Sequence, residues 1–227
     1  MDSVTVLNAS MGVFPPIFHR FRHKGIYVFR FFKEENWRYV IIDKRIPIYD
    51  GAKEYIYSHC TDGSELWVPL IEKAYAKMFG CYYSLVGGFI DEALTDLTSL
   101  PSEKLKLHNR DGTFKEDKED FWRFLMECRE NNSLMGCSRA SDGGKAETHV
   151  IIDGFHTGIL ARHAYGIMDV FEIPAPDKDK TYVAEWGEDI KCHRLLRIRN
   201  PWGKQEWQGK WSIESETDEL ILNQDAI

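Results

Sequence analysis

The segment at residues 195–211, LLRIRNPWGKQEWQGKW, constrains this chain more than any other stretch of its sequence. Its start alternates as a β-strand does, so Leu196, Ile198 and Asn200 share one predominantly apolar side. An asparagine is unusual there, because asparagine is depleted in strands and burying its amide without partners costs about 1–3 kcal/mol. We therefore expect the Asn200 side chain to meet a partner from elsewhere in the chain.

The composition of the 227 residues is that of a folded globular protein. Hydrophobic residues make up 43% and aromatic residues 13%, which is enough for a packed core. The net charge of −7 argues against a general binder of nucleic acids or anionic membranes. No stretch reaches the ~20 apolar residues of a membrane helix, and the chain does not open like a signal peptide. We expect a cytoplasmic protein without a membrane span.

The cysteines do not indicate disulfides or a structural zinc site. They are Cys60, Cys81, Cys128, Cys137 and Cys192. Their odd number and wide scatter do not fit a disulfide framework, and the sequence has no CxxC motif. Reduced thiols are the simplest interpretation.

Periodicity predicts helices mainly in the first part of the chain and strands mainly in the second. The expected elements are a hairpin over 25–51 with its turn at KEEN, helices over 64–80, 90–100 and 120–132, a loop over 141–150, and β segments over 157–173 and 192–200. Ser64 or Asp62 is expected to cap the first of these helices. The pattern predicts an α+β fold.

His163 and Asn200 are two polar residues within these apolar β segments. A histidine can act as a general base near neutral pH when another group fixes its tautomer, and an asparagine carbonyl does this by accepting a ring N–H. Trp202 could shield that hydrogen bond from water. An ordinary core histidine and an ordinary Asn-Pro turn fit the same spacing, so on spacing alone both interpretations stay open.

Four segments together resemble the calpain-type cysteine proteases. They are GIYVFRFFKEENWRYVIIDKRIPIYDG, GSELWVPLIEKAYAKMFGCYYSLVGG, GILARHAYGI and LLRIRNPWGKQEWQGKW. They cover nearly the whole chain in the order of the family. The combination of Asn-Pro-Trp-Gly with Glu-Trp-x-Gly-x-Trp is the most specific part of the resemblance.

The resemblance implies a papain-like protease core made of two halves. The first, helical half would be residues 1–100, and the second half, antiparallel and β-barrel-like, would be residues 101–227. The resemblance also implies that His163 is the catalytic base, that Asn200 orients it, and that Trp202 packs beside the active site. Protein substrates follow from the same family.

The nucleophile is the main departure from the family. Calpain-type enzymes carry their cysteine at the start of a helix upstream of the hairpin, and this sequence begins with what resembles the remainder of that helix. None of the five cysteines is a natural substitute, and Cys81 is expected to follow a helix whose C-terminus disfavours a thiolate. We expect a cysteine endopeptidase core that does not hydrolyse peptides without an upstream cysteine.

Two other functions stay open at this point. The first is a catalytically inactive, calpain-like pseudoprotease that acts as a protein-binding or regulatory module. The second is an unrelated tryptophan-rich β module that binds sugars or peptides, although this would explain neither the histidine segment nor the helix. Arg162 stands where the family has glycine, which could alter which peptide enters the site.

No cofactor follows with certainty, and calcium is the only one that the resemblance raises. Glu65 and Glu206 match one family calcium-ligand position in each half. Ile213 replaces a family aspartate and cannot coordinate a hard cation. The metal ligands are therefore left unassigned.

Overall fold

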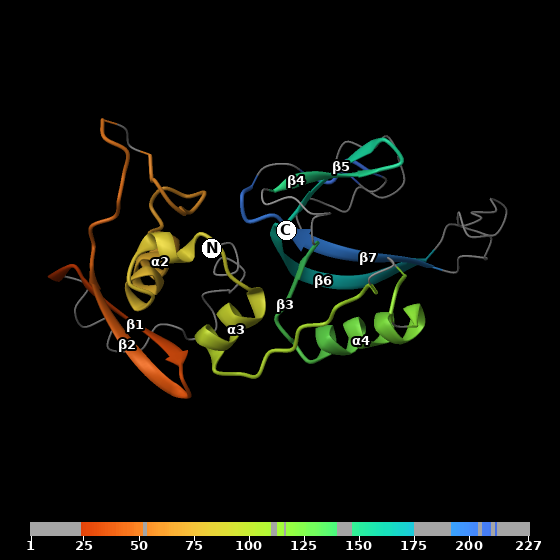
Figure 1. Ribbon diagram of the computed structural model, residues 1–227, viewed down its shortest axis with the longest axis horizontal. Coiled ribbons are helices and arrows are strands. Elements are labelled where there is room, and N and C mark those ends of the chain that lie inside the picture. Colours follow the sequence, from red (N-terminus) through yellow and green to blue (C-terminus); the bar gives the residue numbers. More distant parts are fainter. Residues whose placement is uncertain are drawn as a thin grey trace. The chain divides into compact units, whose positions relative to one another are not determined.

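The computed structural model describes residues 24–51, 54–109, 113–115, 117–139, 147–174, 192–203, 206–209 and 212. The chain divides into two compact units, Met1–Asp117 and Lys118–Ile227. Figure 1 shows their helices and strands, and each unit is described below by itself. Helices and antiparallel strands occur together, as expected for an α+β chain. Within the described residues, no helix is long and apolar enough to cross a membrane.

The first unit contains the predicted hairpin. Strand β1 (Ile26–Lys33) pairs antiparallel with β2 (Asn36–Asp43). The turn lies within KEEN as predicted, and Glu34 and Glu35 both adopt positive φ, at 50° and 61°. Positive φ at both central residues gives the turn a backbone twist that matches that of the strands. The hairpin prediction is confirmed.

The predicted amphipathic helix is α2 (Trp67–Met78), and it packs against the hairpin. One of its faces is buried, and the Tyr75 ring lies 5.3 Å from the ring of fully buried Phe31 in β1. The predicted cap is wrong, because Leu66 is the N-cap and makes no side-chain cap. Asp62 instead accepts the backbone N–H of Ser64 at 2.8 Å, in a turn that precedes the helix.

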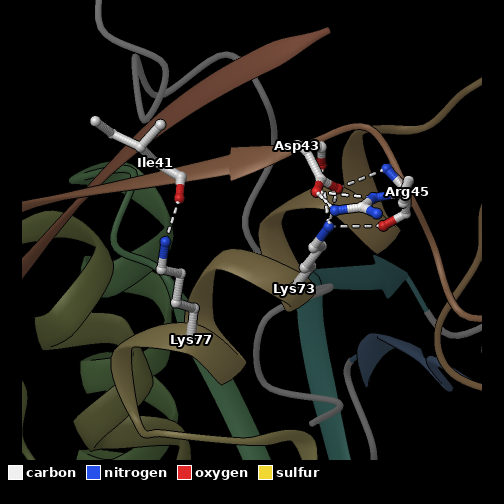
Figure 2. Close-up of polar contacts among 5 residues, drawn as sticks. All are labelled: Ile41, Asp43, Arg45, Lys73 and Lys77. Atoms are coloured by element: carbon white, nitrogen blue, oxygen red, sulfur yellow. Dashed lines mark hydrogen bonds and ion pairs between the residues drawn. The ribbon is translucent and has the colours of Figure 1, made fainter.

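Two lysines of α2 bind the end of β2, as Figure 2 shows. Lys73 Nζ donates to Asp43 Oδ1 at 2.5 Å and to the Arg45 carbonyl oxygen at 2.7 Å. One turn further on, Lys77 Nζ donates to the Ile41 carbonyl oxygen at 2.7 Å. Their spacing of four residues places both ammonium groups on one helix face, and they satisfy carbonyl groups near the end of the strand.

The first unit continues with the 3₁₀ helix η4 (Tyr82–Leu85) and α3 (Ile90–Thr98). α3 is the predicted short helix, and it ends at Ser99, which has φ of 62°, two residues before Pro101. Buried Asp96 joins α3 to its neighbours: it accepts the Tyr75 hydroxyl at 2.7 Å and Lys33 Nζ at 3.2 Å. Burial, followed by this hydrogen bond to Asp96, raises the pKa of Tyr75.

The second unit begins with α4 (Lys118–Glu130), the third predicted helix. β3 (Met135–Ser138), β6 (Ala164–Pro174) and β7 (Cys192–Arg199) form an antiparallel sheet in the order β3-β6-β7. α4 is tied to this sheet by polar contacts, because Trp122 Nε1 donates to Glu172 at 2.7 Å and Arg129 Nε to Asp169 at 2.7 Å.

β4 (Thr148–Ile152) and β5 (Phe155–Ala161) make a separate hairpin in the second unit. The loop predicted over 141–150 is wrong at its end, since Thr148–Ile152 is a strand that pairs with β5; residues 141–146 lie outside the described residues. The expected β-barrel-like arrangement is also wrong for the described strands. These form open sheets and no closed barrel, because β5 pairs with β4 and β6 with β3 and β7.

Candidate active site

His163 lies at the crossing between the two sheets of the second unit. The sequence placed it inside a β segment, but β5 ends at Ala161 and β6 begins at Ala164. Arg162 adopts φ of 61°, and its N–H donates to the Arg139 carbonyl at 2.7 Å, so the chain turns sharply just before the histidine. The His163 side chain is fully buried, with a relative exposure of 0%.

Asn200 follows β7 directly and reaches the same point. The register of β6 and β7 pairs Gly166 with Arg199, which brings the next residue of the chain toward the start of β6. His163 Nε2 and Asn200 Oδ1 lie 2.9 Å apart. The structure thus brings together the two side chains that the sequence singled out, and it gives the Asn200 amide the partner that was expected.

Asn200 Oδ1 accepts hydrogen bonds from two groups, and this determines that the Nε2 atom of His163 carries a proton. The Trp202 backbone N–H also donates to this oxygen, at 3.1 Å, within the Asn-Pro-Trp-Gly turn. An atom that accepts a backbone N–H is the carbonyl oxygen of the amide and not its nitrogen. His163 Nε2 must therefore carry a proton and donate it, so Nδ1 is the nitrogen that faces away from Asn200.

Aromatic rings surround the histidine. The Trp202 ring lies 4.6 Å from the His163 ring in an edge-on arrangement, and the Tyr165 ring lies 4.9 Å away. Trp202 itself is 46% exposed, so it forms an outer wall of the site. Tyr165 is buried, and its hydroxyl accepts the Leu160 N–H at 2.9 Å, which joins the end of β5 to the start of β6.

Glu147 is a site residue that the sequence reasoning missed. Its Oε1 atom lies 3.0 Å from His163 Nδ1. β4 begins at Thr148, which pairs with Ala161, so the residue before β4 falls opposite the residues that follow β5. The strand register brings these two side chains together, and no motif in the sequence indicated it.

The side of β7 that carries Leu196 and Ile198 is largely exposed to solvent. Leu196 is 43% exposed and Ile198 is 36% exposed. This side of the strand is apolar, as the alternation predicted, but it is not buried. The hydrogen bonds of Asn200 to His163 and Trp202 explain its position instead.

The Glu-Trp-x-Gly part of the motif lies against β5. The Gln208 N–H donates to the Thr157 carbonyl at 3.0 Å. At Gly158, where φ is +78°, a Cβ atom would fall 1.9 Å from the Glu206 carbonyl oxygen. Glycine is required at this position for close backbone approach as well as for its conformation.

The described cysteine thiols differ in their environments. Burial raises the pKa of the Cys137 thiol, and burial is also the largest cause that raises the pKa of Cys60. Cys81 was expected to be a poor thiolate, and this is wrong. It precedes the 3₁₀ helix η4 rather than only following α2, and hydrogen bonds from Ser84, its side chain first, lower its pKa.

The described residues do not assemble a clear metal centre. Among them, no group of three or more His, Cys, Asp or Glu side chains is placed to hold an ion. Glu65 is exposed and accepts the Trp67 Nε1–H at 3.3 Å, and Glu206 is exposed beside β5. Ile213 lies outside the described residues.

Comparison with known proteins identifies the class. The family model for calpain family cysteine proteases matches residues 5–225. The chain therefore belongs to the calpain family, whose members are cysteine peptidases. It is similar to Calpain-A of Drosophila melanogaster, with 36% identity over 196 residues, which are 85% of this chain and 21% of that protein.

Other relatives give the same result. Calpain clp-1 of Caenorhabditis elegans is 35% identical over 194 residues, covering 85% of this chain and 21% of the relative. The Calpain-2 catalytic subunit of Homo sapiens is 31% identical over 194 residues, covering 84% and 23%. The chain thus spans about a fifth of the length of these curated relatives.

Proposed function

We propose that this chain is a calpain-like cysteine endopeptidase core acting on protein substrates, with His163 as the base and Asn200 as its orienter. The observation that carries the proposal is the 2.9 Å contact between buried His163 Nε2 and Asn200 Oδ1. The proposed architecture is papain-like, with halves near residues 1–100 and 101–227. A cytoplasmic location is part of the proposal and suits five cysteines that are not in disulfides.

The chemistry follows from which ring nitrogen is held. Because Nε2 donates to Asn200, Nδ1 is the ring nitrogen that would take the proton of a thiol. The thiolate then attacks the peptide carbonyl, and the imidazolium protonates the leaving amine as the carbon–nitrogen bond breaks. Water hydrolyses the resulting thioester, with His163 again serving as the base. Asn200 keeps the ring in one tautomer throughout, and Trp202 limits the access of water to this hydrogen bond.

The thiol itself is proposed to be none of the five in this sequence. Burial disfavours the thiolate of Cys137 and of Cys60. Cys81 has a lowered pKa, but it follows α2, whereas the nucleophile of the family precedes the hairpin. We therefore expect that this chain of 227 residues does not hydrolyse peptides by itself.

Cleavage of an unfolded protein, such as reduced casein, tests the proposal. When a nucleophilic cysteine is supplied upstream of this chain, we expect thiol-dependent cleavage that falls by about 10²–10⁴-fold in His163→Ala, the usual contribution of a general base. Asn200→Ala should lower kcat more than it changes KM, because it affects orientation and not binding. Cleavage that is unchanged in His163→Ala would contradict the proposal.

The alternative is a pseudoprotease that binds proteins without cutting them. The observation that favours it is the Glu147 carboxylate, which lies 3.0 Å from the nitrogen that a thiol would need. Binding of casein without any cleavage, even when the upstream cysteine is supplied, would support this alternative. Cleavage by the 227-residue chain that an alkylating agent abolishes would instead assign the nucleophile to one of its own cysteines.

A further inference from the structure

We propose that Glu147 is a positioning residue that pairs with the His163 base and occupies the nitrogen facing the nucleophile. The proposal rests on the function proposed above, since it concerns the same histidine. The carboxylate of Glu147 would stand where a thiolate stands when the site is engaged. A nucleophile would then have to displace it before the reaction begins.

The two partners of the His163 ring determine which of its nitrogens carry protons. Asn200 Oδ1 requires a proton on Nε2, because the same oxygen also accepts the Trp202 N–H. The Glu147 carboxylate is an acceptor as well, and it lies 3.0 Å from Nδ1. If Nδ1 carried no proton, lone pairs of nitrogen and oxygen would face each other at hydrogen-bond distance. The geometry therefore fits an imidazolium that donates from both nitrogens, one to an amide oxygen and one to a carboxylate.

The His163 side chain is more deeply buried than that of Glu147. The His163 side chain has a relative exposure of 0%, whereas the Glu147 side chain retains 32%. A buried imidazolium needs an anion beside it, because an unpaired charge away from water is strongly unfavourable. Glu147 supplies this anion from the rim of the site. Burial raises the pKa of the neighbouring Tyr165 hydroxyl, and the negative charge of Glu147 acts in the same direction.

The Glu147 carboxylate and a thiolate would compete for the same ring nitrogen. A thiol protease in its reactive state holds a thiolate against the imidazolium. Here a carboxylate holds the same nitrogen, so replacing one anion with the other leaves both ring protons in place. Glu147 would thus keep the ring protonated and correctly oriented while blocking its contact with a thiolate.

Histidine ¹⁵N NMR of the 227-residue chain in neutral buffer tests the proposal without needing a nucleophile. In the wild type we expect His163 to show a proton on each ring nitrogen, with the Nδ1–H protected from exchange with water. In Glu147→Gln we expect the Nδ1–H signal to be lost, because the neutral amide can donate to Nδ1 and the ring becomes neutral. Glu103→Gln, at an exposed position in the other unit, is the matched control and should leave His163 unchanged.

Two results would overturn the proposal. One is a wild-type His163 that carries a proton on a single nitrogen, and this needs no variant to fold. The other is a Glu147→Gln chain with unchanged amide spectra in β5 and β6 and an unchanged Nδ1–H. The failure of the proposed function would look different, because it would appear as casein cleavage that does not depend on His163.

Discussion

The orientation of the His163 ring depends on one oxygen atom, that of the Asn200 amide. This oxygen accepts the ring Nε2–H at 2.9 Å and the Trp202 N–H at 3.1 Å. The second bond prevents the amide from rotating by half a turn, since its nitrogen would then face a backbone donor. The Pro-Trp-Gly turn after Asn200 therefore does more than reverse the chain. It fixes Nε2 of the histidine toward Asn200, so that Nδ1 is the nitrogen on the other side of the ring.

Gly158 provides a test of the backbone contact beside this site. Gly158→Ala should destabilise the protein by about 2–4 kcal/mol, because a methyl group would meet the Glu206 carbonyl and φ is positive. Gly154→Ala is the matched control: its φ is similar, at +80°, but nothing lies within 4 Å of the added atom. It should cost only about 1 kcal/mol. Urea unfolding measures both, and equal losses would contradict the explanation by steric contact.

The cysteines allow a second prediction for single residues. Hydrogen bonds from Ser84 lower the pKa of the exposed Cys81 thiol, whereas burial raises that of Cys137. The thiolate is the reactive form, so Cys81 should react with iodoacetamide well before Cys137 at neutral pH. Ser84→Ala should slow the reaction of Cys81 alone. Mass spectrometry of the alkylated peptides gives the order, and faster labelling of Cys137 would contradict it.

Among the secondary-structure elements, the contact between α2 and the end of β2 shows how a helix position is secured. Lys73 reaches the Asp43 carboxylate and the Arg45 carbonyl, and Lys77 reaches the Ile41 carbonyl (Figure 2). The sequence predicted both elements, because alternation in β2 and the three- and four-residue spacing in α2 are local patterns. It did not predict this contact, since nothing local links residue 43 to residue 73.

This contact predicts an acid-sensitive contribution to stability. Hydrogen bonds from Arg45 and then Lys73 hold the pKa of Asp43 below its ordinary value. A carboxyl with a lowered pKa stabilises the fold above its unfolded pKa of about 4 and loses this contribution as the pH falls through the folded value. Asp43→Asn should therefore be less stable than the wild type near neutral pH, and the difference should shrink below about pH 4.

Urea unfolding at a series of pH values measures this difference. Asp50→Asn, at an exposed position in the same unit, accounts for the general effect of removing a carboxylate. The effect of Asp43 should be small and weaker in high salt, because the ion pair is partly exposed to solvent. A difference that grows on acidification would have the wrong sign for this interpretation.

The ends of elements were harder to predict than their centres. α2 was expected to be capped by Ser64 or Asp62, but those residues form a turn before the helix, and Leu66 is the N-cap. β4 begins within a stretch whose composition indicated a loop. In both cases the competing local conformations differ little in energy, so packing against other segments decides between them.

For the whole molecule, each of the two compact units has its own buried residues. Phe31 is fully buried in the first unit, and Val170 is fully buried in the second. Phe31→Ala should cost about 3–5 kcal/mol, the usual loss when a large core side chain is truncated. Because the core of each unit is formed by its own elements, the loss of protection should be concentrated in β1, β2 and α2.

Native-state hydrogen exchange shows where this destabilisation acts. Phe31→Ala should speed amide exchange in the first unit and leave β6 and β7 protected. Val170→Ala is the reciprocal variant, expected to cost about 2 kcal/mol and to act on the second unit. Equal loss of protection throughout the chain in either variant would show that the units unfold as one.

The sequence by itself determined the α+β composition, the hairpin and the three predicted helices, and its resemblance to the calpain family pointed to His163 and Asn200. These depend on local periodicity and on motifs whose residues are close together in the chain. Only the tertiary structure decided that the described strands form open sheets, that His163 sits at the crossing between two of them, and that Glu147 reaches its second nitrogen. Strand register makes these contacts, and register depends on pairing between distant segments, which a local pattern does not encode.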